Sequence, residues 1–456
     1  MSNNSPPSPL LTREGRKEFD LAILGGGPGG YAAAIRAAQL GAKVVLIEQD
    51  KVGGTCLNRG CIPTKALIAS TNFYERMQKA ESLGLSATNI SIDFAKVVAR
   101  KNEVVAKLVK GLAGLIEKNG IEIIYGQGEV VAPGLIKINN RDVQSRAIIL
   151  ATGSLPASLP GVAHDGKKFI CSDEALELAI PPARLDIIGG GVIGIHFAMI
   201  YSSLGTAITI YEAQPEILPG VDDEVVAMVK RLLKRKKIEV LTGTFFDPQK
   251  AGEVSLICVG RTPNLTGIEA LGLRQEGKRV WVNEKMETSL PNIYAVGDLV
   301  SLKQFAHVGY EQGVVAAENA LGGNRSYNYD CVPYGIYTQP EIAGVGLTEK
   351  EARVKNPNIK TGKFPFGALG IAQAMGEIEG FVKFVADEKG KILGVHIIGP
   401  EATALIGMAT LAIKNNLTIE QFGSTFQAHP SYPEGMQEAA EAVLNRALHI
   451  EIRGLA

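Results

Sequence analysis

The sequence lacks the features of a membrane-spanning or exported protein. No apolar run reaches the roughly 18 residues that a transmembrane helix needs. The N-terminus has no apolar signal core either. Residues 1–18 are polar and proline-rich, and we interpret them as a disordered tail or a processed leader to which no function is assigned. These absences predict a cytoplasmic protein that has no membrane partner.

Cysteine is scarce and neither sign of charge is in excess. The 456 residues contain five cysteines, too few for the disulfide framework of a secreted protein, so any disulfide is expected to be catalytic. Lys plus Arg and Asp plus Glu number 47 each, so no net charge attracts nucleic acid. The length predicts two to four domains, and 52 glycines are typical of an α/β protein with many tight turns.

Two segments of the sequence repeat each other at a constant offset of 164 residues. In each copy an apolar β-type run leads into G-x-G-x-x-G and a helical pattern, and a second strand ends on an acid 23 positions after the first glycine. This context favours a dinucleotide-binding unit over a plain glycine-rich turn, because the helix N-terminus binds a pyrophosphate and the acid binds a ribose. The residues are Gly25, Gly27, Gly30 and Glu48 in the first copy, and Gly189, Gly191, Gly194 and Glu212 in the second.

The second copy favours NAD over NADP. Glu212 would repel a 2′-phosphate, and no arginine follows it closely. Two later segments, 145–154 and 288–300, are predicted strands that end in small turns, where ligands bind in α/β folds, although each could also be an ordinary buried strand. The chain after about residue 328 mixes β-type and helical runs without a fingerprint, so we expect a separate α+β domain there.

Cys56 and Cys61 follow the first repeat within KVGGTCLNRGCIPTKAL. Residues five apart on a regular helix point about 140° away from each other, whereas a disulfide needs Cα atoms within roughly 7 Å. A bonded pair therefore requires a distorted turn, for which Gly60 and Pro63 supply helix breakers. Two unrelated buried cysteines remain the alternative. A metal site has little support, because the six histidines are scattered and there is no second cysteine pair.

Several further motifs occur in a fixed order with this cysteine segment. They are ATG at 151–153, GRTPN at 260–264, YAVGD at 294–298, VPYGIYTQPEIAGVGLTE at 332–349 and AHPSYPE at 428–434. With GGTCLNRGCIPTK they resemble the pyridine nucleotide-disulfide oxidoreductases over nearly the whole chain. The redox motif is most similar to that of the branch that oxidises dihydrolipoamide. The resemblance implies a flavoprotein with FAD on the first repeat and NAD on the second.

The resemblance also implies residue roles. Cys56 exchanges with the dithiol, Cys61 faces the flavin, and Lys65 lies near flavin N5. His429 and Glu434 form an acid/base dyad that reaches Cys56 from the other subunit of a homodimer. A base is needed because a dithiol is mostly protonated at pH 7, although His429 seen alone could be structural. The predicted cofactor-binding residues are Gly25, Gly27, Gly30, Glu48, Thr55, Thr152, Gly153, Gly297, Asp298, Ala306 and His307, followed by Gly189, Gly191, Gly194, Glu212, Gly260 and Arg261.

The implied fold is α/β, with two Rossmann-like domains and a C-terminal α+β dimerisation domain. The implied activity is oxidation of protein-bound dihydrolipoamide to lipoamide with reduction of NAD+ through a Cys56–Cys61 redox disulfide. The implied partners are lipoyl groups of 2-oxo acid dehydrogenase or glycine-cleavage components. The predicted domains are 19–152 with 289–327 for FAD, 153–288 for NAD and 328–456 for dimerisation, after the 1–18 tail.

Two positions depart from the family pattern. His196 stands where the family has a glutamate that pairs with the lysine near the flavin. Residues 245–253 are too few for the three-stranded meander that relatives place there. Two alternatives therefore stay open: a reductase of another small disulfide, and a flavoprotein subunit with impaired NAD exchange. We interpret Cys171, Cys258 and Cys331 as buried small apolar residues.

Overall fold

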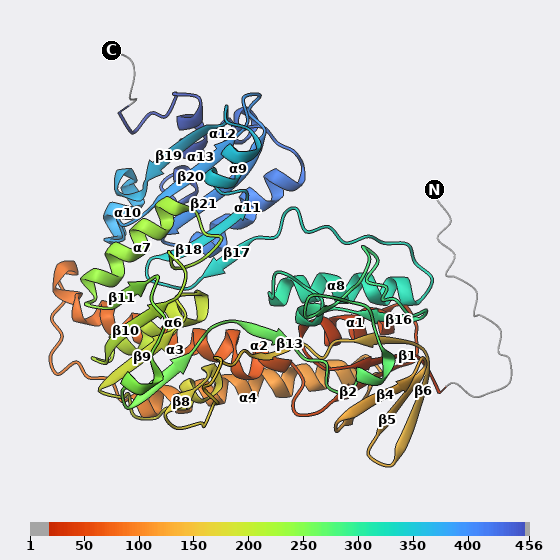
Figure 1. Ribbon diagram of the computed structural model, residues 1–456. Coiled ribbons are helices and arrows are strands. Elements are labelled where there is room, and N and C mark those ends of the chain that lie inside the picture. The colour runs from red at the N-terminus through yellow and green to blue at the C-terminus, as the bar shows by residue number, and fades with distance from the viewer. Residues whose placement is uncertain (1–17, 452–456) are drawn as a thin grey trace. The chain divides into compact units, whose positions relative to one another are not determined.

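A computed structural model describes residues 18–451, so almost all of the predicted N-terminal tail lies outside the described residues (Figure 1). The chain divides into two compact units. The first unit comprises the chain up to Thr64 together with Ala99–Ala157 and Arg261–Asn328, and the second comprises Lys65–Val98, Ser158–Gly260 and the chain from Tyr329 onward. Within 18–451, no helix is long and apolar enough to cross a membrane.

The first unit is built on a seven-stranded sheet in the order β3-β2-β1-β6-β5-β4, with β16 also paired to β6. The pairs among β1, β2, β3, β6 and β16 are parallel, whereas β4, β5 and β6 form an antiparallel meander. The central strands β1 and β2 are mostly apolar and buried, apart from Asp20 in β1 and Glu48 at the end of β2, as is typical of parallel strands that are covered on both faces. The strands are β1 Phe19–Leu24, β2 Val44–Glu48, β3 Glu122–Tyr125, β4 Gly128–Ala132, β5 Leu135–Ile138, β6 Arg141–Leu150 and β16 Ile293–Ala295.

Two helices of the first unit pack closely through glycines. They are α1, Pro28–Gln39, and α8, Ala306–Ala320. A Cβ atom on Gly313 would lie 2.2 Å from the carbonyl oxygen of Gly29, so only glycine permits this approach. The other elements of this unit are α2 Gly54–Arg59, β7 Ser154–Pro156, β13 Arg261–Pro263, β14 Gln275–Glu276 and β15 Arg279–Val280, with short 3₁₀ turns at Glu269–Leu271 and Gly297–Leu299. Two helices, α3 Cys61–Gln78 and α4 Phe94–Lys118, each contain a boundary between the units.

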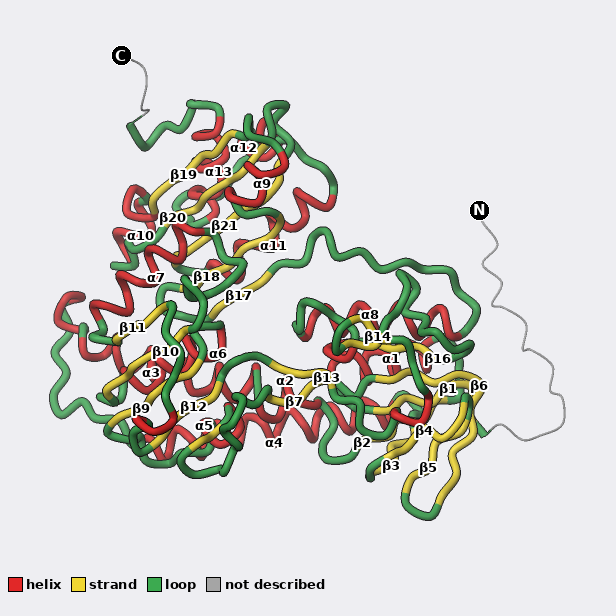
Figure 2. The backbone as a smooth tube through the Cα atoms, viewed as in Figure 1, coloured by secondary structure: helices red, strands yellow, loops and turns green. Residues whose placement is uncertain are grey.

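The second unit holds a parallel sheet in the order β11-β10-β9-β12-β8. Figure 2 shows β9 to β12 side by side. The strands are β8 Phe169–Ile170, β9 Arg184–Ile188, β10 Ala207–Glu212, β11 Glu239–Thr242 and β12 Val254–Ile257, and the helices are α5 Ser172–Ala175, α6 Val192–Ser202 and α7 Asp223–Arg235. Between β11 and β12 the chain forms only a 3₁₀ turn, Pro248–Lys250, so the described residues contain no meander here. The parallel sheet is continuous without a meander, because β12 pairs directly with β9.

The C-terminal part of the second unit is an antiparallel sheet in the order β17-β18-β21-β20-β19. Its strands are β17 Tyr334–Ile336, β18 Glu341–Gly346, β19 Lys360–Pro365, β20 Phe381–Ala386 and β21 Ile392–Gly399, and its helices are α9 Glu349–Lys355, α10 Gly370–Met375, α11 Ala402–Lys414, α12 Ile419–Gly423 and α13 Pro433–Val443. The 3₁₀ turns Ala80–Leu83 and Phe366–Ala368 also belong to this unit. The predicted combination of parallel α/β sheets with a C-terminal α+β region is confirmed.

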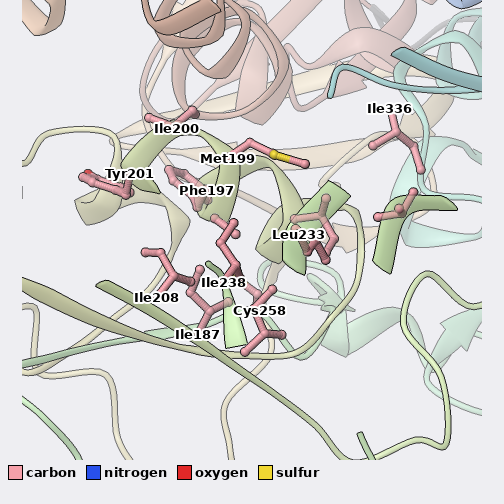
Figure 3. Close-up of a cluster of buried hydrophobic side chains, with 14 of the residues drawn as sticks. Ile187, Phe197, Met199, Ile200, Tyr201, Ile208, Leu233, Ile238, Cys258 and Ile336 are labelled. Carbon is pink, nitrogen blue, oxygen red and sulfur yellow. The ribbon is translucent and has the colours of Figure 1, made fainter. Parts of the chain in front are cut away.

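One hydrophobic cluster joins β17 to the parallel sheet of the second unit. Figure 3 shows Phe197 and Met199 of α6 among the side chains of this cluster, together with Ile336 of β17. Ile336 is 1% exposed. The end of β17 is therefore anchored in the same hydrophobic cluster as the helix that follows the second fingerprint.

A buried ion pair links α7 to β20. Asp222 caps the N-terminus of α7 by accepting the Glu224 amide, and both of its carboxylate oxygens accept hydrogen bonds from Lys383 Nζ, at 3.1 and 3.2 Å. The side chains of Asp222 and Lys383 are 1% and 3% exposed. Burial opposes the charge on Lys383, but hydrogen bonds to Glu349 and Glu224 and the charge of Asp222 raise its pKa above the ordinary value. Lys383 therefore stays charged at neutral pH, and its buried ammonium group depends on these carboxylates to offset the cost of burial.

We expect Asp222→Ala to lower the free energy of unfolding by about 3 kcal/mol, because it removes a helix cap and one partner of a buried ammonium group. Denaturant titration of the purified protein measures this change. Glu224→Gln is the control: Glu224 contacts the same lysine but is 42% exposed, so its loss should cost about 1 kcal/mol or less. Equal losses in the two variants would contradict this assignment.

Candidate active site

The first fingerprint forms a tight turn between β1 and α1. Gly25 has φ +105°, and a Cβ atom there would lie 2.2 Å from the Ala151 carbonyl oxygen. A Cβ on Gly30 would lie 1.8 Å from the Gly25 oxygen. Gly27 caps α1 with no side-chain hydrogen bond, so the helix N–H groups are directed at the turn. This arrangement fits a bound pyrophosphate.

Glu48 lies at the end of β2 and closes the same turn. Its Oε2 accepts the Gly26 amide at 2.7 Å, and its Oε1 accepts the Asp50 amide at 2.8 Å. The side chain is buried. The carboxylate is thus fixed beside the glycine turn, at the position where a dinucleotide presents its ribose.

The second fingerprint repeats the main contacts of this turn. Gly189 has φ +109° and lies against the Cys258 carbonyl, and a Cβ on Gly194 would lie 2.1 Å from the Gly189 oxygen. Glu212 Oε2 accepts the Gly190 amide at 2.7 Å, and Gly191 caps α6 without a side-chain hydrogen bond. The second unit therefore also fits a dinucleotide, and the short β11–β12 connection leaves this geometry intact.

The two redox cysteines lie on two helices that Gly60 separates. Cys56 is in α2, and Cys61 is the first residue of α3. Gly60 adopts φ −142° and ψ −105°, and a Cβ there would lie 3.0 Å from the Thr55 carbonyl oxygen. The predicted distorted turn is confirmed. Cys61 lies at the N-terminus of helix α3, where the helix dipole favours a thiolate.

The cysteine segment is packed directly onto the first fingerprint. The Gly53 amide donates to the Gly26 oxygen at 2.7 Å. A Cβ on Gly54 would lie 2.6 Å from Gly27 Cα. These contacts place α2 beside the turn that fits the pyrophosphate, which is where a flavin extends from its phosphates.

A polar cluster lies at the ends of β6 and β16. Asp298 Oδ2 accepts the Ser154 hydroxyl at 2.6 Å, and Ser154 Oγ in turn accepts Arg261 Nε at 2.7 Å. Arg261 also reaches Thr55 Oγ1 at 3.4 Å. Arg261 therefore lies with the residues of the first unit, although it follows the second fingerprint in the sequence. Ser154 was not predicted, and its place directly after ATG is the only signal that points to it.

The remaining predicted residues of the first unit lie on two neighbouring segments. Thr152 Oγ1 donates to the Asn264 oxygen at 2.6 Å, which joins the ATG segment to GRTPN. Gly297 has φ +71°, and its amide donates to Gln312 of α8. Ala306 and His307 begin α8, where the His307 ring stacks on Phe305 at 5.3 Å. Gly260, with φ +109°, belongs to the second unit.

Two tyrosines that sequence reasoning missed lie close to the cysteine pair. Tyr31 of α1 and Tyr310 of α8 have ring centroids 5.6 Å apart and share a hydrogen bond. Burial raises the pKa of both phenols, and the charges of Cys56 and, at Tyr310, of Cys61 raise it further. Both phenols therefore stay protonated at neutral pH. The helical spacing alone could not distinguish them from core residues.

His429 and Glu434 form a hydrogen-bonded pair in the second unit. His429 Nδ1 lies 2.8 Å from Glu434 Oε1, and Glu434 Oε2 accepts the Ser431 amide at 2.7 Å. Burial opposes ionisation of Glu434, but the hydrogen bonds from His429 and Ser431 outweigh it and hold its pKa below the ordinary value. Because the carboxylate accepts at Nδ1, the His429 Nε2 is left to act as a base. The His429 side chain is 79% exposed.

Lys65 and His196 come together at the end of β17. Lys65 Nζ lies 4.5 Å from the centroid of the Tyr337 ring. His196 is buried and accepts the Tyr337 amide at its Nε2. His196 thus takes part in the surroundings of Lys65 without supplying a negative charge.

The other three cysteines differ from one another. Cys171 and Cys258 are buried, as predicted, and burial together with Glu174 raises the pKa of the Cys171 thiol to about 11. The prediction was wrong for Cys331, which is only half-buried because it precedes β17 in a connecting segment. Among residues 18–451, no group of three or more His, Cys, Asp or Glu side chains could hold a metal ion.

Comparison with known families agrees with this geometry. Residues 19–320 match the pyridine nucleotide-disulphide oxidoreductase family, and residues 332–440 match the dimerisation domain of the same family. The chain belongs to the pyridine nucleotide-disulphide oxidoreductases. Its cofactors are FAD and NAD, which the two fingerprint turns fit.

Curated relatives and solved structures define the branch more closely. The chain is 41% identical to the dihydrolipoyl dehydrogenase of Thermus scotoductus and 40% identical to that of Bacillus subtilis, in each case over 95% of this chain and 99% of the relative. It is similar to the crystal structure of LpdA from Mycobacterium tuberculosis, with a TM-score of 0.86, 26% identity and coverage of 92% and 99% of the two chains. It is also similar to the HOCl-induced flavoprotein disulfide reductase RclA from Escherichia coli, with a TM-score of 0.84, 25% identity and coverage of 93% and 99%.

We expect Gly54→Ala to weaken FAD binding by about tenfold to a hundredfold, because the added methyl group forces α2 away from Gly27. The ratio of flavin to protein absorbance after dialysis measures retention. Gly41→Ala is the matched control: Gly41 also has positive φ, at +85°, but nothing lies within 4 Å of an added Cβ. Full retention of FAD by Gly54→Ala would contradict the role of this contact.

Proposed function

We propose that this protein is a dihydrolipoamide dehydrogenase: it oxidises dihydrolipoamide to lipoamide and reduces NAD+ through FAD and a Cys56–Cys61 redox disulfide. The observation that carries the proposal is the packing of the cysteine segment on the first fingerprint turn through Gly53 and Gly54. The 41% identity to a dihydrolipoyl dehydrogenase over 95% of the chain supports the choice of substrate.

In the proposed reaction, His429 Nε2 takes a proton from one thiol of dihydrolipoamide. The thiolate attacks Cys56 Sγ, the Cys56–Cys61 bond breaks, and Cys61 leaves as a thiolate at the N-terminus of α3. The second thiol of the substrate then attacks the substrate sulfur that is bonded to Cys56. The mixed disulfide breaks, and lipoamide and the Cys56 thiol are released. Bound FAD supplies the transfer of the electron pair from the reduced cysteines to NAD+. Glu434 keeps the His429 ring oriented through its hydrogen bond to Nδ1.

The proposal includes a homodimer in which His429 serves Cys56 of the partner subunit. Three observations support it. Residues 332–440 match a dimerisation domain. The His429 side chain is 79% exposed although its carboxylate partner is already in place. Phe426, three residues earlier, is 97% exposed, which is unfavourable for an aromatic side chain unless another surface covers it.

The remaining assignments follow from the proposed activity. Lys65 acts at the flavin, and the residues of the two fingerprint turns hold FAD and NAD. Lipoyl groups of 2-oxo acid dehydrogenase or glycine-cleavage components are the proposed partners, because the dithiol substrate is the reduced form of a lipoyl group. We also propose a cytoplasmic location, which the scarcity of cysteine supports.

An anaerobic experiment tests the proposed function. Purified holoenzyme is mixed with NADH and, separately, with dihydrolipoamide, and flavin absorbance is recorded. The proposal predicts reduction by both, together with NADH formation when dihydrolipoamide and NAD+ are supplied together. Reduction by neither compound would contradict it.

A second candidate is a reductase of another small disulfide. It is favoured by His196, which departs from the family pattern, and by the structural similarity to the disulfide reductase RclA. This candidate predicts reduction by NADH alone. Reduction by dihydrolipoamide alone would instead indicate a flavoprotein subunit with impaired NAD exchange.

We expect His429→Gln to slow flavin reduction by dihydrolipoamide by about 10²–10⁴-fold, because the attacking thiol loses its base. Reduction by NADH should be unchanged, since that step does not use a thiol. Stopped-flow absorbance measures both rates in the same preparation.

His449→Gln is the matched control for this variant. His449 Nδ1 lies 2.8 Å from Glu438 Oε1, the same separation as in the proposed dyad, and its side chain is 67% exposed. Its loss should change the dihydrolipoamide rate by no more than about twofold, because no thiol chemistry is assigned to this pair. A defect of equal size in the two variants would remove the special role of His429.

A further inference from the structure

Three side chains from separate parts of the sequence meet in the second unit. Lys65 belongs to α3, one helical turn after Cys61. His196 belongs to α6, directly after the second fingerprint. Tyr337 directly follows β17. This cluster is outside the thiol chemistry described above, and no role has yet been given to His196 or Tyr337.

The hydrogen bond between His196 and Tyr337 fixes the protonation state of the imidazole. The Tyr337 amide donates to His196 Nε2 at 2.9 Å. A backbone amide can only donate, so Nε2 carries no proton and His196 is neutral with its proton on Nδ1. Burial, followed by the nearby charge of Lys65, lowers the pKa of His196 well below its ordinary value, in agreement with this tautomer.

The Tyr337 backbone is held on both sides. Ile336, immediately before it, is 1% exposed and belongs to the cluster in Figure 3 that contains Phe197 of α6. His196, on the same helix, then accepts the Tyr337 amide. The hydrophobic cluster therefore anchors Ile336 at the end of β17, and His196 of α6 fixes the Tyr337 backbone that directly follows it.

The Tyr337 ring in turn contacts the Lys65 ammonium group. Lys65 Nζ lies 4.5 Å from the ring centroid, within the roughly 6 Å range of a cation–π interaction. The ring is half-buried, so the contact is partly shielded from water. The neutral His196 cancels none of the Lys65 charge.

We propose that His196 is a positioning residue that fixes the Tyr337 ring as the platform for Lys65, and thereby keeps the Lys65 ammonium group directed at the flavin. The last step rests on the proposed role of Lys65 at the flavin. A positive charge beside the flavin favours its reduced form, because reduction adds negative charge. Loss of the platform therefore lowers the flavin's midpoint potential.

Two readouts test this proposal on the holoenzyme. Hydrogen exchange of the peptide that contains Tyr337 reports the His196 hydrogen bond. Equilibrium reduction against a reference dye reports the midpoint potential, and neither measurement uses a dithiol or NADH. Failure of the proposed dihydrolipoamide activity would therefore leave this test unaffected.

The His196 variants separate the hydrogen bond from the imidazole itself. In His196→Leu the Tyr337 amide loses its acceptor, so its exchange should become about tenfold faster. The flavin's reduction equilibrium should shift about tenfold toward the oxidised form, which is about 30 mV for a two-electron couple. His196→Gln supplies a neutral acceptor and should restore both properties at least in part.

The Tyr337 variants test the ring. Tyr337→Leu removes the platform and should lower the midpoint potential as His196→Leu does. Tyr337→Phe keeps the face of the aromatic ring, so its midpoint potential should equal that of the unaltered protein. A potential as low in Tyr337→Phe as in Tyr337→Leu would overturn the proposal, because the hydroxyl group and not the ring would then matter.

His396→Leu is the control for removal of a buried histidine. His396 is 1% exposed, and its Nε2 lies 2.9 Å from the Leu347 oxygen, but it has no contact with Tyr337 among the described hydrogen bonds. It should change neither the exchange at Tyr337 nor the potential. Equal effects of His396→Leu and His196→Leu would overturn the proposal, as would faster exchange in His196→Leu without any change in potential.

Discussion

The close approach of Gly54 to Gly27 is the contact on which the site in the first unit depends. It allows a helix that carries a redox cysteine to lie against the turn that fits a pyrophosphate. The approach requires that Gly54 has no Cβ atom, because one there would lie 2.6 Å from Gly27 Cα, and Gly53 adds a backbone hydrogen bond to the same turn. Thiol chemistry and dinucleotide binding are thereby joined by backbone atoms, whose positions vary little with side-chain motion.

The same backbone geometry occurs again in the second fingerprint, and it is preserved although the connection between β11 and β12 is short. In both fingerprints a glycine with positive φ lies against a carbonyl group just after a neighbouring parallel strand, β6 or β12, and a buried glutamate accepts an amide of the turn at 2.7 Å. The second unit has no meander between β11 and β12, yet β12 still pairs with β9. The dinucleotide geometry depends on the order of the parallel strands and not on the elements inserted between them.

Backbone features of the site were predictable from the sequence because glycine and motif spacing determine them. The turns at Gly25 and Gly189, the break at Gly60 and the acids Glu48 and Glu212 all follow from local patterns. The contacts of Arg261 with Ser154 and of His196 with Tyr337 were not predictable, because they join residues 107 and 141 positions apart. Cys331 shows the same limit, since the exposure of a residue in a connecting segment depends on tertiary packing.

His196 shows why a departure from a family pattern needs the structure for its interpretation. The sequence alone indicates only that a carboxylate is missing near Lys65. The structure shows that the imidazole binds the backbone of Tyr337, whose ring faces the lysine. The substituted residue therefore has a contact of its own.

The central claim is that Cys56 and Cys61 have different tasks, and the long-wavelength charge-transfer absorbance of the holoenzyme tests it most directly. Cys56→Ser leaves Cys61 alone beside the flavin, so the account predicts that this band is present without any reductant. Cys61→Ser should not develop the band even after anaerobic reduction by one equivalent of dithiol. A band of equal strength in Cys61→Ser and in the unaltered protein would contradict the account.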